Sequence, residues 1–215
     1  MADFTLVIGN KNYSSWSLRP WFVLQYVGAD FEEIRIPLDQ PQTKAQLLSH
    51  SPTARVPVLK HQHLVLWESL AICEYLAEQF PAAQLWPEAD HARAIARAVS
   101  HEMHAGFTAL RTHMPMDCRS RYPGQGHTPE VLADIERIQT LWRDCRQTYG
   151  SEGDFLFGDI TIADAMYAPV VSRFVTYGVA GDPISQAYCD AIWHHPVMQT
   201  WLTAAAAETE VIEQP

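Results

Sequence analysis

The sequence predicts two regions, a small α/β unit followed by an all-α region. Over residues 1–80, short apolar runs rich in β-branched residues alternate with helical patterns in the order β-α-β-α-β-β-α. Residues 81–90 contain two prolines and no hydrophobic period, which is typical of a linker. Residues 91–215 are richer in alanine and carry only patterns long enough for helices. We therefore expect an α/β domain, a linker and an all-α domain.

The first four elements follow from hydrophobic pattern and punctuation. The run at residues 4–9 is apolar and β-branched, as in a buried strand, and a polar loop follows it. A helix is predicted over residues 17–28, because glycine commonly ends a helix. A second strand is expected over residues 31–37, and a short helix over residues 44–49.

A β-hairpin is predicted next, from two β-rich runs at residues 56–60 and 64–67 that flank a polar turn. Pro57 has no N–H for a ladder, so its strand should end there and leave the Val56 backbone free for an extended partner. Ser69 is a favourable N-cap residue for the helix that follows.

Glu68 and Ser69 offer complementary groups at the start of that helix. A carboxylate binds an ammonium group, whereas a hydroxyl and the free N–H groups of a helix start bind a carboxylate. A zwitterionic head group fits this arrangement. An edge-strand proline and an ordinary capped helix explain the same residues, so the rest of the chain must decide between the two interpretations.

The second region is predicted to be helical throughout. Thr161 and Asp164 have the spacing of a capping box, which we interpret as a purely structural helix start. The predicted helices cover residues 92–113, 129–149, 162–176 and 196–207.

Charge and hydropathy exclude several partners. The chain has 15 Lys and Arg against 25 Asp and Glu, a formal net charge of -10. This charge repels nucleic-acid phosphates and anionic membrane surfaces, and no basic cluster reverses it locally. No apolar run reaches the roughly 20 residues of a membrane-spanning helix. We expect neither a nucleic acid nor a membrane as a partner.

Cysteine and histidine spacing indicates a reduced, cytoplasmic protein without a metal. The N-terminus lacks a basic-then-apolar leader, and the segment 101–104 lacks the i, i+4 histidine spacing of a zinc helix. No nucleophile elbow, phosphate loop or dinucleotide glycine pattern is present. The four cysteines are scattered and form no C-x-x-C pair: Cys73, Cys118, Cys145 and Cys189.

Taken in order, these features resemble the glutathione transferases over nearly the whole chain. Four motifs carry the resemblance: the loop 14–19 (Ser-Ser-Trp-Ser-Leu-Arg), residues 56–59 (Val-Pro-Val-Leu), the pair Glu68-Ser69, and the capping box at 161–164. In that family a thioredoxin-like first domain holds glutathione, residues 56–59 include a cis proline, and a helical second domain supplies most of the co-substrate site. The serine loop is most similar to the zeta class, which includes maleylacetoacetate isomerases. That class usually has cysteine where this chain has Trp16, which narrows the entrance of the site.

The resemblance implies a set of glutathione contacts. The Val56 backbone, held by Pro57, is expected to pair with the tripeptide. Glu68 is expected to bind the γ-glutamyl ammonium group, and Ser69 with the helix start is expected to bind the γ-glutamyl carboxylate. Gln42 lies where the family often places a further polar contact. The resemblance also implies a two-fold homodimer.

A serine suits the activation of the glutathione thiol. A thiol with a pKa of about 8.5 is only a few per cent ionised at neutral pH. A hydroxyl donor and a helix N-terminus together favour the thiolate by about one to two pKa units. Ser14 matches the first serine of the family loop and is our first candidate, with Ser15 as the alternative. Ser17 is the better candidate for capping the helix.

The co-substrate site is less well defined by the sequence. Trp16, His104, Phe107, Arg111 and Tyr167 are candidates for lining it, although aromatic residues at helical spacing more often belong to the core.

The predicted function is that of a glutathione transferase that adds the thiolate to a small, largely apolar electrophile in detoxification. Glutathione acts as co-substrate, and no metal is expected. One alternative is a glutathione-dependent cis–trans isomerase similar to maleylacetoacetate isomerase. Another is a non-catalytic glutathione-binding or interaction module of the same fold.

Overall fold

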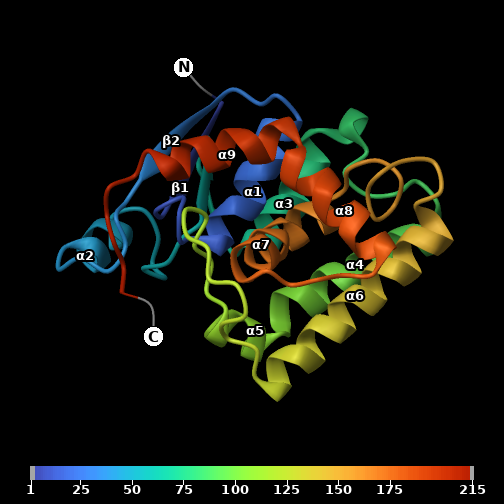
Figure 1. Cartoon of the computed structure of the whole chain (residues 1–215). Helices are drawn as coiled ribbons and strands as arrows, with labels where there is room; N and C mark the ends of the chain where they lie inside the picture. Colours follow the sequence, from blue (N-terminus) through green and yellow to red (C-terminus); the bar gives the residue numbers. More distant parts are fainter. Residues whose placement is uncertain (1–2, 214–215) are drawn as a thin grey trace.

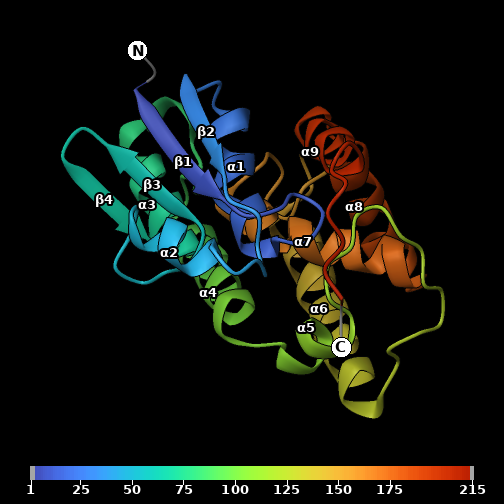
Figure 2. The same cartoon turned by 90° about the vertical axis from the view of Figure 1, so that its left-hand side faces the viewer.

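The first region of the chain (Figure 1) folds around a four-stranded mixed sheet, whose strands are all labelled in Figure 2. The structure is a computed structural model that describes residues 3–213. The strand order is β2-β1-β3-β4, with β1 parallel to β2 and the other neighbours antiparallel. The strands are β1 (Phe4–Ile8), β2 (Phe31–Arg35), β3 (Val58–His61) and β4 (Leu64–Trp67).

Helices cover both faces of this sheet. Successive side chains of β1 point to opposite faces. Leu6 therefore joins the main core with the first and third helices, whereas Val7 packs with Leu47 of the second helix in a smaller cluster. These helices are α1 (Ser15–Tyr26), α2 (Thr43–Leu48) and α3 (Ser69–Gln79).

The second region is helical, as predicted, and Figure 2 shows it beside the sheet. Nearly every side chain of α7 is buried, and α7 packs against α1, α3, α4 and α8, so it joins the two regions. The elements are η1 (Pro81–Ala83), α4 (Asp90–Ala105), α5 (Thr108–His113), α6 (Pro129–Tyr149), α7 (Ile162–Tyr177), α8 (Pro183–His194) and α9 (Pro196–Ala206). A domain boundary within residues 81–90 stays a prediction.

One helix prediction was wrong, and one helix was not predicted. The expected helix over residues 92–113 is two helices, because Gly106 is extended and Phe107 has a φ of 57°, in the left-handed region. Helix α8 was not predicted at all. Its start does carry a sequence signal, since Asp182 accepts hydrogen bonds from the next N–H groups and Pro183 occupies the first helical position.

The capping box at the start of α7 is confirmed. The buried Asp164 carboxylate accepts hydrogen bonds from the Thr161 N–H at 2.8 Å and from the Leu156 N–H at 3.1 Å. The Thr161 hydroxyl donates to the same carboxylate at 2.9 Å. The side-chain polar groups of this capping box therefore have partners within the protein.

Candidate functional site

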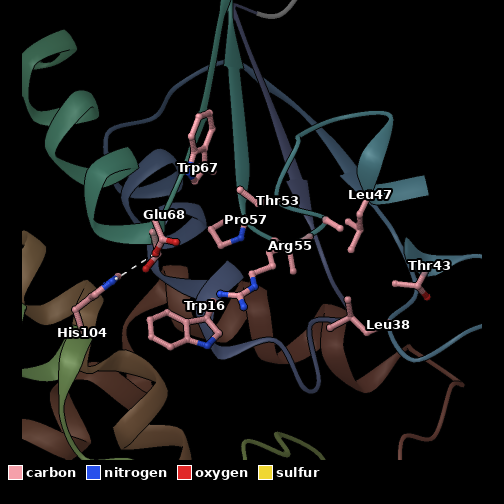
Figure 3. Close-up of a pocket in the computed structure, with 13 residues that line it drawn as sticks. Trp16, Leu38, Thr43, Leu47, Thr53, Arg55, Pro57, Trp67, Glu68 and His104 are labelled. Carbon is pink, nitrogen blue, oxygen red and sulfur yellow. Dashed lines mark ion pairs between the residues drawn. The ribbon is translucent and has the colours of Figure 1, made fainter. Parts of the chain in front are cut away.

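A cavity of about 580 Å³ lies beside residues 53–57, the segment that leads into the hairpin strand β3 (Figure 3). It is bordered by the start of α1, the loop before β3 and the start of α3. The lining residues are Trp16, Leu38, Thr43, Leu47, Thr53, Ala54, Arg55, Val56, Pro57, Trp67, Glu68, Ser69 and His104.

The Val56 backbone lies just outside the sheet, as the position of Pro57 in the sequence predicted. The Val56-Pro57 peptide bond is cis, and the ladder between β1 and β3 begins at Val58. Because Val56 lines the cavity without joining the ladder, its backbone groups are available to an extended ligand.

The start of α3 leaves polar groups unused. Ser69 was expected to be the N-cap, but Glu68 holds that position with a φ of 71°, and Ser69 is the first helical residue. Ser69 is 1% exposed, and its Oγ has no hydrogen-bond partner within residues 3–213. The helix start has no side-chain cap. A buried hydroxyl and free N–H groups that line a cavity form a site for an anion.

His104 is the contribution of the helical region to this cavity. Its Nε2 lies 3.5 Å from the Glu68 Oε2, as the dashed line in Figure 3 shows. Burial, followed by the neighbouring Arg19 cation, lowers the pKa of His104 below its usual value of 6.5. The imidazole is therefore mainly neutral at pH 7, and it leaves the Glu68 carboxylate free to pair with a cation.

Sequence reasoning missed Arg55 as a site residue. Its exposed side chain lines the same cavity, and it forms no ion pair within residues 3–213. Its place directly before the Val56-Pro57 pair was the available signal. After the N-terminus of α3, the Arg55 guanidinium is a second positive group that can bind a ligand carboxylate.

A second cavity, of about 330 Å³, adjoins the first. The two share Trp16, Leu38 and Val56, so a ligand paired with the Val56 backbone in the first cavity borders the second. The second cavity is lined by Tyr13, Ser14, Ser15, Trp16, Leu38, Val56, Arg111, Pro115, Met116 and Arg173.

The serine loop forms a short hydrogen-bonded chain. Ser14 occupies the N-cap position of α1, and its Oγ lies 2.7 Å from the Ser17 Oγ. The Ser17 Oγ also accepts the Gly9 N–H at 3.1 Å. The prediction that Ser17 caps the helix was wrong, because Ser17 lies inside the first turn, fully buried against the end of β1.

Three arginines lie beside Trp16 or line the second cavity, namely Arg19, Arg111 and Arg173. The guanidinium of Arg19 lies 4.2 Å from the Trp16 ring centroid and that of Arg111 lies 5.4 Å from it. Arg19 is buried, and its Nε and Nη1 lack hydrogen-bond partners in the described part of the chain. Burial, together with Arg173 and Arg111, lowers the pKa of Arg19 to about 9. Such a cluster stabilises negative charge in the cavity.

Three predicted site residues lie outside both cavities. Tyr167 is buried in the core, where its hydroxyl donates to the Val99 carbonyl, and Phe107 is buried at the break between α4 and α5. Their aromatic surface covers the core and does not line the site. Gln42 is exposed before α2, and it is the next residue, Thr43, that lines the first cavity.

The described residues contain no metal-ligand cluster and no exposed thiol. The side chains described in residues 3–213 include no group of three His, Cys, Asp or Glu that could hold a metal ion. All four cysteines are free and buried, and burial raises the pKa of Cys118 to about 11. Within the same range, no helix is both long and apolar enough to span a bilayer.

Comparison with known proteins identifies the family of this chain. The family description "Glutathione S-transferase, N-terminal domain" matches residues 13–79. A probable maleylacetoacetate isomerase of Caenorhabditis elegans is 30% identical over 165 residues, which are 75% of this chain and 74% of that protein. The maleylacetoacetate isomerase of Rattus norvegicus is 34% identical over 177 residues, covering 80% and 79% of the two chains.

A solved structure extends the similarity to the whole fold. The crystal structure of a glutathione transferase homologue from Burkholderia with bound glutathione superimposes with a TM-score of 0.70 and 28% identity, covering 95% of this chain and 99% of that one. The thioredoxin-like fold with a helical second region is therefore established. This chain belongs to the glutathione S-transferase family.

Proposed function

We propose that this protein binds glutathione in the first cavity and directs its thiolate at an electrophile in the second. One observation carries the proposal: the two cavities share a wall at Trp16, Leu38 and Val56, with the anion-binding helix start on one side and the serine loop on the other. The glutathione bound to the Burkholderia homologue supports this assignment.

The groups of the first cavity match the ends of glutathione. Glu68 pairs with the γ-glutamyl ammonium group. The Ser69 hydroxyl, which has no partner among residues 3–213, binds the adjacent carboxylate together with the start of α3. The Val56 backbone pairs with the cysteinyl unit, which directs the sulfur toward the second cavity. Arg55 receives the glycine carboxylate at the other end.

Hydrogen-bond accounting favours Ser14 over Ser15 as the donor to the sulfur. The Ser17 Oγ already accepts a hydrogen bond from the Gly9 N–H. Among the described contacts, the Ser17 hydroxyl proton has the Ser14 Oγ as its acceptor. With Ser17 donating, the Ser14 proton is free to point at a thiolate. Ser17 thus acts as a positioning residue, and no general base is needed.

The test is a titration of the bound thiol. Ser14→Ala should raise its pKa by about one to two units, because a hydrogen bond to a charged acceptor is worth about 1.5–3 kcal/mol. Thiolate absorbance near 240 nm measures this pKa, and Ser15→Ala serves as the matched control. A shift in Ser15→Ala alone moves the role to Ser15, and a shift in neither variant refutes the serine mechanism.

A cis–trans isomerase is the second candidate function. Arg111 and Arg173 both line the second cavity, and two cations suit a substrate with carboxylate groups better than the small apolar electrophile expected from the sequence. Four relatives bear the name maleylacetoacetate isomerase, one of them as probable. Direct assay with maleylacetoacetate and with a chromogenic aryl halide separates isomerase from transferase. Retention on glutathione-agarose without either activity favours a non-catalytic binding module.

We propose further that the protein is a cytoplasmic homodimer. The β4 edge of the sheet supports the dimer, because Leu64, Val65 and Trp67 are each about 40% exposed there. Light scattering at micromolar concentration should give twice the chain mass of 24.3 kDa, and a mass of 24.3 kDa would contradict the dimer.

A further inference from the structure

A third cavity, of about 730 Å³, lies against the far side of the serine loop. Tyr13 and Pro115 line both this cavity and the second one, so the two adjoin directly before Ser14. The third cavity is lined by Tyr13, His113, Pro115, Asp117, Arg119, Ser120, Tyr122, Gln125, Gly126, Tyr177, Val211, Ile212 and Glu213.

The guanidinium group of Arg119 holds one wall of the third cavity together through hydrogen bonds. Arg119 donates from Nη2 to the Tyr13 hydroxyl at 3.0 Å and to the Glu210 carbonyl at 2.8 Å, and from Nη1 to the Glu208 carbonyl. The Glu208 carboxylate accepts the backbone N–H groups of Lys11 and Asn12. The C-terminal segment is thereby fastened to the serine loop, and both form one wall of the cavity.

The other side of the cavity combines aromatic surface with satisfied polar groups. The rings of Tyr122 and Tyr177 lie 5.8 Å apart, and their hydroxyls donate to Asp117 and to the Pro115 carbonyl. Burial acts to raise the pKa of Asp117, but hydrogen bonds from Asn12, Ser120 and Arg119 hold it below its ordinary value. The carboxylate stays ionised and already has its donors.

The lining offers much ring surface, and its Asp117 and Arg119 groups already have partners within the protein. The exposed Glu213 carboxylate forms no ion pair within residues 3–213, so it can accept a hydrogen bond from a ligand hydroxyl. Val211 is 75% exposed at this cavity and adds apolar surface. The exposed Gln125 and half-buried Ser120 supply neutral hydrogen-bonding groups at the same cavity. Tyrosine rings and neutral polar groups suit an aromatic ring that carries a hydroxyl.

We infer that the electrophile is a two-part molecule, with its reactive carbon in the second cavity and a hydroxylated aromatic ring in the third. This inference rests on the proposed function, because it takes the sulfur of glutathione to lie near Ser14. The third cavity is larger than the second, so the tail of the co-substrate has more room than its reactive end.

The test compares two electrophiles that share one reactive ring. One is N-methyl-4-chloro-3-nitrobenzamide, and the other carries a 4-hydroxyphenethyl group on the amide nitrogen. In both, the glutathione sulfur forms a bond to the ring carbon, and chloride leaves with the electron pair of the broken bond. The wild-type protein should turn over the long probe with a kcat/KM about tenfold higher than the short one, as burial of a hydrogen-bonded ring allows.

A variant that fills the third cavity with a larger side chain tests whether the long probe gains its advantage there. Gln125→Trp should cancel the advantage of the long probe and leave the short probe unchanged, because Gln125 contributes no side-chain hydrogen bond within residues 3–213 and lies outside the first two cavities. Gln79→Trp, at an exposed position at the end of α3, is the matched control.

Calorimetry with the two glutathione conjugates gives the same comparison without turnover. Equal kcat/KM and equal affinity for the two probes, or an equal loss for both in Gln125→Trp, overturns the inference while the proposed function stands. Absence of both glutathione binding and turnover refutes the proposed function itself.

Discussion

The starts of α3 and α7 each contain an acidic residue and a hydroxyl residue, but only the side chains at α7 form hydrogen bonds that cap the helix. At α7, the Asp164 carboxylate holds two backbone N–H groups and the Thr161 hydroxyl, and all of these groups are buried. At α3, the N-cap Glu68 makes no capping hydrogen bond, and the buried Ser69 hydroxyl has no partner among residues 3–213.

The difference separates a helix start that stabilises the fold from one that we propose to bind a ligand. A buried polar group without a partner costs free energy, so it persists where something else offsets that cost. Glu68 adds a φ of 71°, an uncommon conformation for a side chain of its size. We expect mutations at α7 to change stability, and mutations at α3 to change affinity for glutathione.

The largest effect is expected from Asp164→Ala. This change removes the capping box and leaves buried N–H groups unpaired, so unfolding free energy should fall by about 2–4 kcal/mol. Urea denaturation measures the loss. Asp182→Ala, at the more exposed cap of α8, should cost only about 1 kcal/mol. Equal losses in the two variants would contradict the role assigned to burial.

Glu68→Ala should lower glutathione affinity by about 2 kcal/mol, because it removes a charge-assisted hydrogen bond to the γ-glutamyl ammonium. Calorimetry gives the dissociation constant, and the unfolding midpoint in urea should barely move. Glu78→Ala, at an exposed position of the same helix, is the control. An unchanged dissociation constant removes Glu68 from the site.

Ser69→Ala sharpens the comparison further. Affinity for glutathione should fall by about 1 kcal/mol, whereas stability should stay equal or rise slightly, since the variant deletes a buried hydroxyl that has no partner in the described part of the chain. Thr161→Ala should do the reverse, with a lower unfolding free energy and unchanged glutathione binding. A Ser69→Ala protein that is less stable and binds normally would place Ser69 with the structural caps.

The smallest effect concerns pH. The pKa of His104 is below 6.5 in the folded protein, so the unfolded chain binds its proton more readily. The stability linked to His104 is therefore present above pH 6.5 and declines as the pH falls through the folded value. Protonated His104 also pairs with Glu68 and repels the ligand ammonium group.

Binding of S-methylglutathione, which has no titrating thiol, isolates this effect. Its affinity should be constant from pH 8 to 7 and fall about two- to threefold once His104 is protonated, as for a partly exposed ion pair. In His104→Phe the affinity should not depend on pH across this range. A pH dependence retained in His104→Phe assigns the titration to another group.

Local patterns in the sequence predicted the features that depend on neighbouring residues. The seven-element order of the first region, the free Val56 backbone beside Pro57, and the capping box at Thr161 are examples. Each depends on a proline, a cap or a hydrophobic period within a few residues. Part of the candidate site is therefore readable from the sequence, because Glu68 and Ser69 are neighbours along the chain.

Only the tertiary structure decided which faces became core and which became cavity. The hydrophobic period of the sequence assigns Tyr167 to an apolar helix face. The packing of α7 at the centre of the molecule buries this side chain away from the candidate site. The arginine cluster around Trp16 joins α1, α5 and α7, and the third cavity joins the serine loop to residues 211–213. A cavity is the space that packing leaves between segments distant in sequence, so no single segment encodes it.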